Sequence, residues 1–271
     1  MSSKRHIRNF LISVLSALGI VSLYRRAQKK QGPLVRVVVF HNVTDGAWFT
    51  SMLETLVRTY HVLTPEAFVA RQFDAHKVNV LITFDDGYAS WHEVCAPRMS
   101  ELGIRAVFFV NSGLVDAYDD PVAQAAFVQN QLLLSPRRTI SWSGVRELVG
   151  AGYTIGGHTK THARLAQLQE DAMVVEIAAD KDRIQEMAGK SPTLFAYPFG
   201  NRSDFGERDM AYAEEVGYTH AFSTEPRFVH VNDRFAIPRL CIEDGISAAT
   251  LAQWVEGGYD CYAKIKRVCA R

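Results

Sequence analysis

The sequence lacks the features that mark several protein classes. Its four cysteines, among 271 residues, include no C-x-x-C pair, so neither a zinc-ribbon motif nor a dense disulfide framework is present. Thirty basic side chains stand against 29 acidic ones, for a net charge of +1, and the body of the chain has no long charged run. This balance gives no support to nucleic-acid binding. No apolar run reaches the ~20 residues that usually span a bilayer as one helix.

The longest apolar stretch runs from Phe10 to Tyr24, with basic residues on both sides. As a helix it would be about 22 Å long, short of a hydrocarbon core of about 30 Å. A signal peptide, a short membrane anchor, an interfacial helix and a buried terminal helix are the alternatives. The lack of an A-x-A cleavage site and the basic flanks favour a membrane anchor. Basic residues on both flanks leave its orientation open, and a secreted or periplasmic location is compatible. We therefore separate residues 1–30 from one domain over residues 31–271.

From residue 35 onward, short β-prone runs alternate with helical patterns. Strands are expected at residues 35–41, 62–63, 78–84, 106–110, 153–155, 193–197, 221–223 and 237–241. Helices are expected at 48–58, 65–73, 91–102, 143–149, 168–187, 207–216 and 247–257. Repeated strand–helix units favour parallel strands in an α/β barrel or open sheet. Residues 122–133, inside a long connection, are expected to be helical and to form a lid.

Two adjacent carboxylates, Asp85 and Asp86, end one of these strands and are followed by Gly87. In α/β proteins the C-terminal ends of parallel strands carry the chemistry. Neighbouring side chains of an extended strand point to opposite sides, so the two acids are expected to do different work. One would hold a metal ion while the other handles a proton. A solvated Asp-Gly turn is the simpler alternative.

A pair of histidines, His158 and His162, follows the strand expected at residues 153–155. Histidines four residues apart share one face of a helix and can reach one divalent ion. Zincin proteases use this spacing with a glutamate after the first histidine, but here Thr159 follows it. The base must therefore come from elsewhere, and the strand-end acids are the obvious source. Two imidazoles and one carboxylate leave a position for water, as in catalytic zinc sites.

A third segment, from Phe195 to Gly200, carries another strand into a turn. Pro198 fixes the backbone there, and Gly200 allows a tight reversal. The N–H of Phe199 is a candidate to stabilise a developing oxyanion. Tyr197, together with Tyr88 and Trp142, is a candidate to stack on sugar rings, although aromatic side chains in a barrel more often belong to the core.

Together the three segments resemble the polysaccharide deacetylases, the NodB-homology domain of carbohydrate esterase family four. Residues 83–87 look like the first family motif, residues 158–162 like the second and residues 195–200 like the third. The similarity extends over residues 35–242. It implies a distorted (β/α)7 barrel and an N-acetylated or O-acetylated glycan as substrate. It also implies Asp85 as the general base and Asp86, His158 and His162 as ligands of the metal.

The sequence departs from the family pattern at two places. Residues 237–242 contain no histidine where a later motif supplies the catalytic acid, and Ala196 stands where many members have arginine. His41, at the end of the first strand, resembles the histidine with which one branch of the family opens, and it is our candidate acid. Arg239 is our candidate to orient Asp85 and keep it ionised. A capping or core histidine and a surface salt bridge are the respective alternatives.

These observations predict a hydrolase that removes acetyl groups from a polysaccharide or lipid-linked glycan, with water activated at the metal and Asp85 as base. The ligand types favour zinc and leave cobalt, nickel and manganese open. The expected partner is the acetylated glycan, together with a membrane reached through the stretch from Phe10 to Tyr24. Two rivals remain: a metal-dependent amidase or deformylase acting on a non-polymeric substrate, and a glycan-binding domain without turnover.

Overall fold

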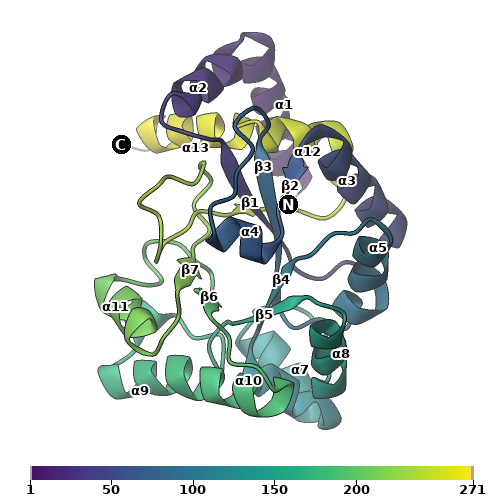
Figure 1. The fold of residues 1–271 in the computed structure, drawn as a ribbon, viewed down its shortest axis with the longest axis vertical. Coiled ribbons are helices and arrows are strands. Elements are labelled where there is room, and N and C mark those ends of the chain that lie inside the picture. The colour runs from purple at the N-terminus through teal and green to yellow at the C-terminus, as the bar shows by residue number, and fades with distance from the viewer. Residues whose placement is uncertain (1, 270–271) are drawn as a thin grey trace.

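The computed structural model describes residues 2–269, and its centre is one parallel β-sheet that curls into a half-barrel (Figure 1). The strand order is β7-β6-β5-β4-β3-β1-β8, and β2 pairs with β3 beside this path. The strands are β1 (Val35–Phe40), β2 (His61–Val62), β3 (Asn79–Asp86), β4 (Val107–Val110), β5 (Thr154–Gly157), β6 (Leu194–Ala196), β7 (His220–Phe222) and β8 (Leu240–Cys241). The α/β fold of the NodB-homology type is confirmed.

The register of the central strands brings their C-terminal ends to one edge. Asp86 of β3 pairs with Val110 of β4, and Val110 pairs in turn with Gly157 of β5. On the other side of β3, Phe84 pairs with Phe40, so residue 41 emerges at the same edge. The segments that follow these strands carry the candidate catalytic residues. They therefore meet at the C-terminal ends of the strands, although they are far apart in sequence.

The two faces of the sheet bury different sets of apolar side chains. Leu81, Phe109 and their neighbours form the cluster inside the half-barrel. Phe84 and Phe108 belong to the other cluster, under the surrounding helices, and their rings stack at 4.7 Å between centroids. Because side chains alternate along a strand, Asp85 has the parity of Leu81 and is directed to the inner face. The alternation thus decides which of the two acids enters the barrel.

The segment that leads into β8 connects the two sides of the curled sheet, β7 and β1. Ile237 forms a parallel bridge with Phe222 of β7, whereas Leu240 pairs with Val38 of β1. The chain therefore crosses from one edge of the curled sheet to the other within a few residues. Arg239 lies on this crossing, which we call the closing segment (residues 237–241).

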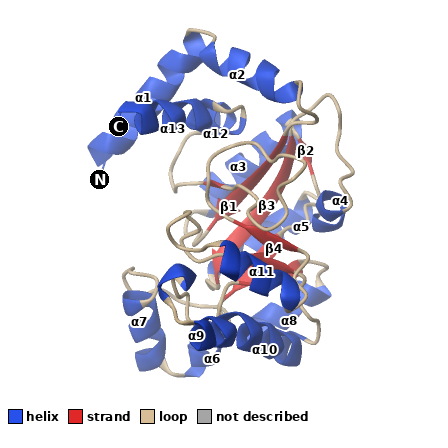
Figure 2. Cartoon of the chain, turned by 90° about the vertical axis from the view of Figure 1, so that its left-hand side faces the viewer, coloured by secondary structure: helices blue, strands red, loops and turns tan. Residues whose placement is uncertain are grey.

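Helices surround the sheet, as Figure 2 shows. Polar side chains cap several of them: the side chains of Asp45, Thr64, Ser141 and Ser247 each accept from a backbone N–H of the first helical turn, as expected of helix starts. The helices of the body are α3 (Gly46–Thr59), α4 (Pro65–Val69), α5 (Ala96–Glu101), α6 (Ser112–Asp116), α7 (Pro121–Asn130), α8 (Trp142–Gly150), α9 (Glu170–Val174), α10 (Asp180–Ala188), α11 (Glu207–Glu215), α12 (Ala248–Val255) and α13 (Gly258–Cys269).

Two expected helices contain a wider turn. The helix expected at residues 168–187 consists of α9 and α10 joined by a π-helical turn, Val175–Ala179. The helix expected at residues 91–102 begins with another π-helical turn, Trp91–Cys95, before α5. Such turns often mark functional sites. Asp180 directly follows the turn at Val175–Ala179 and is fully buried.

The N-terminal residues form two helices, α1 (Ser2–Ala17) and α2 (Ile20–Lys29), that meet at Gly19 in a left-handed conformation, with φ of 75°. Helix α1 lies against α12 and α13. Ile12 is fully buried there, and Arg8 donates two hydrogen bonds, of 2.6 and 2.7 Å, to Glu243. Within residues 2–269 no single helix has the length and apolarity to cross a bilayer; Lys4–Ala17 and Ile20–Lys29 meet the criteria of length and composition only together, as a pair bent by 73°.

Candidate active site

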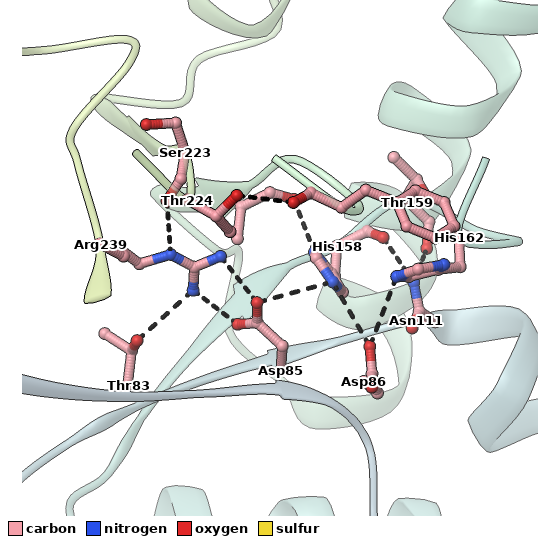
Figure 3. A network of polar contacts seen from close by, with 12 residues as sticks. Thr83, Asp85, Asp86, Asn111, His158, Thr159, His162, Ser223, Thr224 and Arg239 are labelled. Carbon is pink, nitrogen blue, oxygen red and sulfur yellow. Dashed lines mark hydrogen bonds and ion pairs between the residues drawn. The ribbon is translucent and has the colours of Figure 1, made fainter. Parts of the chain in front are cut away.

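Asp85 and Arg239 form a buried ion pair inside the half-barrel (Figure 3). The guanidinium donates to both carboxylate oxygens at 2.7 Å, the bidentate geometry that gives the strongest charge-assisted hydrogen bonds. The side chains of Arg239 and Asp85 are 0% and 4% exposed. A third hydrogen bond, from Nε of Arg239 to the carbonyl of Ser223 at 3.0 Å, fixes the arginine. The pair is therefore interior, and Arg239 is not part of a surface salt bridge.

Asp86, His158 and His162 converge beside this pair. Oδ1 of Asp86 lies 3.6 Å from Nε2 of His158 and 3.5 Å from Nε2 of His162. All three residues are buried, and their candidate ligand atoms lie within 4.8 Å of one another. Tetrahedral bonds of about 2.0–2.2 Å hold neighbouring ligand atoms roughly 3.3–3.5 Å apart. The spacing and the donor set therefore fit a divalent cation.

Backbone carbonyls fix which nitrogen of each histidine faces the cluster. Nδ1 of His158 lies 2.7 Å from the carbonyl of Ala196, and Nδ1 of His162 lies 3.2 Å from that of Gln131. Because a carbonyl can only accept, each Nδ1 carries the proton. Each Nε2 then faces the cluster, the usual arrangement of metal-binding histidines.

The two histidines lie on a loop, so the expected shared helical face is wrong. Thr159 and His162 adopt left-handed conformations, with φ of 63° and 58°. The Asn111 amide donates to the carbonyls of His158 and Thr159 at 2.5 and 3.0 Å. Glu176 accepts from the Thr161 N–H at 2.8 Å. These contacts stabilise backbone angles that a helix does not contain, and the turn brings both imidazoles to one point.

Asp180 supports the site and was missed by the sequence reasoning. Its carboxylate accepts from the N–H of His158 at 3.1 Å and from that of Ser112 at 2.9 Å. Burial raises the pKa of Asp180 to about 7, although these hydrogen bonds oppose the shift. The only sequence signal is an acid within a helix expected to be amphipathic. Asp180 thus orients the backbone that carries a candidate ligand.

The charges of the site reflect burial and pairing together. Burial acts to raise the pKa of Asp85, but Arg239 and then His158 outweigh it, and this pKa lies below its ordinary value. Burial lowers the pKa of His162 to about 4, with Asp86 opposing. Asp85 is therefore ionised and His162 neutral near pH 7, the states that a base and a ligand require.

The structure separates the members of the third segment. Phe199 lies at the site: its ring centroid is 4.6 Å from that of His162, and its φ is 60°. Pro198, buried beside it, precedes this turn. Tyr197 is 1% exposed, stacks on Phe205, and donates its hydroxyl to the carbonyl of Phe235 at 3.0 Å. The structure therefore does not bring the Tyr197 side chain to the cluster.

His41 lies at the edge of the site rather than in it. Its side chain is exposed and lines a hollow of about 170 Å³ together with Tyr88, Arg137 and Asp244. Tyr88, by contrast, is 0% exposed. Trp142 is 8% exposed and donates to Asp116 at 2.8 Å. Neither aromatic side chain offers an open face to a sugar.

Comparisons with known proteins place this geometry in a family. Residues 74–221 match the polysaccharide deacetylase family. The chain is 23% identical over 201 residues to YxkH of Bacillus subtilis, a protein placed by its name among the polysaccharide deacetylases. The match spans 73% of this chain and 64% of YxkH, so the chain covers less than two thirds of that relative's length.

Solved structures share the fold at low sequence identity. The Streptococcus pyogenes deacetylase PplD, solved with acetate, superposes with a TM-score of 0.68 at 19% identity, covering 83% of this chain and 99% of PplD. IcaB from Ammonifex degensii gives a TM-score of 0.65 at 21% identity, covering 83% of this chain and 98% of IcaB. At such identities the likeness concerns the fold alone. With more than half of its residues matched, this chain belongs to the polysaccharide deacetylase family.

Proposed function

We propose that residues 31–271 form a metal-dependent deacetylase that hydrolyses acetyl groups on an acetylated glycan. The observation that carries the proposal is the convergence of Asp86, His158 and His162 beside a second carboxylate, Asp85, that is held ionised. Nε2 of His158 lies 3.8 Å from Oδ2 of Asp85. Water at a cation held by the three ligands would therefore be within reach of Asp85. One site then contains both a cation-binding set and a base.

The ligands Asp86, His158 and His162 would hold the cation, with zinc favoured by two imidazoles and one carboxylate. When bound, a divalent cation lowers the pKa of a coordinated water and polarises the acyl carbonyl. Asp85 accepts the proton from the attacking water, and Arg239 keeps the carboxylate oriented and charged for that step.

Two further groups complete the proposed reaction. The Phe199 N–H has no backbone acceptor within the described residues, and it can donate to the oxygen that becomes negative during attack. Pro198 positions that N–H by fixing the preceding backbone. His41, at the rim, donates a proton to the departing amine, because histidine is the side chain most often used as a general acid.

The test is acetate release from acetylated glycans, compared with a panel of small amides, formamides and acetyl esters. We expect the wild-type protein loaded with zinc, cobalt, nickel or manganese to release acetate from a glycan. Asp85→Asn should lower kcat by about 10²–10⁴-fold while glycan binding persists. A protein that binds glycans but releases no acetate with any of these metals is a binding domain. Preference for a small amide would instead identify a different hydrolase.

We further propose that α1 and α2 attach the domain to a membrane surface. Several apolar side chains of these helices are exposed, among them Phe10 and Leu18 at 68% and 69%, and basic residues flank them, as in interfacial helices. Phe10→Ser/Leu18→Ser should reduce flotation with anionic vesicles. Val122→Ser, at an 80% exposed apolar side chain on α7, is the matched control. Equal flotation of the first variant and wild type would refute this attachment.

A further inference from the structure

A large groove extends from the rim of the candidate active site to the N-terminal helix. The hollow that contains His41 is lined by Leu134 and Asp244, and the same two residues line a groove of about 1270 Å³. The two depressions therefore adjoin each other. A volume of this size exceeds the roughly 300–1,000 Å³ typical of small-ligand sites, so the groove has room for substrate beyond the reacting sugar.

The walls of this groove come from both ends of the chain. Helix α1 contributes residues 4–8, α13 contributes Tyr262 and Lys266, and the segment after β8 contributes Glu243 and Asp244. Contacts between α1 and the body fix this arrangement, because Arg8 is bonded to Glu243 and its guanidinium also lies 4.8 Å from the ring of Trp254. The N-terminal segment is thus a structural wall of the groove.

Cations outnumber anions along the groove. Four basic side chains line it, against Glu243 and Asp244, although the whole chain carries only +1. Arg8 already neutralises Glu243. Lys4 and Lys266 are exposed and take part in no ion pair among residues 2–269. Arg5 reaches Glu243 only at 3.9 Å.

The cations of the groove that are not neutralised can bind an anionic group of a ligand. The guanidinium fork of Arg8, which matches carboxylate and phosphate alike, is occupied on both terminal nitrogens by Glu243. The remaining cations are mainly lysine ammonium groups, which bind phosphate as point charges. We propose that this groove binds a phosphate-bearing segment of the glycan substrate while the acetylated sugar lies at Asp85 and His41. The proposal rests on the deacetylase function proposed above.

The test compares two N-acetylated oligosaccharides that differ only in a phosphate group, with binding measured separately from acetate release. We expect the wild-type protein to bind the phosphorylated oligosaccharide at least tenfold more tightly, and Lys4→Glu/Lys266→Glu to reduce that ratio toward one. Lys77→Glu/Lys190→Glu is the matched control. It makes the same charge change at exposed lysines that precede β3 and β6, near the N-terminal ends of the strands and away from the candidate site. It should retain the wild-type ratio.

The outcomes separate the two proposals. Equal affinity of the wild type for both oligosaccharides, or an unchanged ratio in Lys4→Glu/Lys266→Glu, overturns the phosphate assignment even if acetate is released. Tighter binding of an oligosaccharide that carries a uronate in place of the phosphate overturns it as well. A retained phosphate preference without acetate release supports the groove and refutes the deacetylase function. Circular dichroism melting checks that all variants are folded.

Discussion

Removing Arg239 should change the pH at which the protein works. In Arg239→Gln the Asp85 carboxylate stays buried but loses a cation that donates two hydrogen bonds of 2.7 Å. An adjacent cation lowers a carboxyl pKa by about 1–3 units. The acidic limb of kcat/KM, which reports ionisation of the base in the free enzyme, should therefore move to higher pH by about 1–3 units.

The same substitution should lower stability in a pH-dependent way. Breaking a buried ion pair from one side costs about 3–5 kcal/mol. Because Arg239 holds the pKa of Asp85 below its ordinary value, the stability from this pair is complete above that ordinary value. It is lost as the pH falls through the lowered pKa of the folded state. The difference in free energy of unfolding between wild type and Arg239→Gln should thus decrease at acidic pH.

Arg36→Gln is the matched control. Arg36 is also fully buried and donates to both oxygens of Asp260 at 3.1 Å, but it lies near the start of β1, at the opposite end of the sheet. Both variants should unfold at lower temperature, and only Arg239→Gln should shift the acidic limb of acetate release. Arg239→Lys, which keeps the positive charge but not the bidentate guanidinium, should shift the acidic limb by less than Arg239→Gln. A destabilised Arg239→Gln with the wild-type pH profile would show that the arginine is structural only.

Three further predictions follow from the packing of the site. His158→Ala should contain less than about a tenth of the wild-type metal by elemental analysis, because one of three ligands is lost; His220→Ala, on β7, should retain the metal. Asp180→Asn should weaken metal affinity by about 10–100-fold in competition with a chelator, and unchanged affinity would contradict its supporting role. Gly157→Ala should lower the free energy of unfolding by about 1–3 kcal/mol, because the new Cβ would overlap the buried hydroxyl of Tyr218. Gly150→Ala, with open space around the new Cβ, should change thermal unfolding by no more than about 1 kcal/mol.

The strands were predictable because their sequence signal is local. β-branched runs with polar ends locate β1, β3 and β4 within one or two residues, and parallel pairing then brings their ends together. The neighbourhood of Asp86 and the two histidines followed from that topology. The pairing of Arg239 with Asp85 was also proposed from sequence, since both lie at strand ends.

Features that depend on distant contacts were not predictable. The turn at residues 158–162 adopts left-handed angles because side chains of Asn111 and Glu176, remote in sequence, bind its backbone. The packing of α1 on α13 likewise joins two elements from opposite ends of the chain. Asp180 is oriented by backbone N–H groups of Ser112 and His158, which lie 68 and 22 residues away in the sequence.

The closing segment brings the cation of the site from beyond the part of the chain that matches the family. The candidate ligands Asp86, His158 and His162 all lie within the part of the chain that matches the family, which ends at residue 221. The guanidinium that keeps Asp85 ionised belongs to Arg239, which lies between the residues that pair with β7 and with β1. Under the proposed function, a chain cut before Ile237 would therefore contain all three candidate ligands but would lack the cation that holds Asp85 ionised.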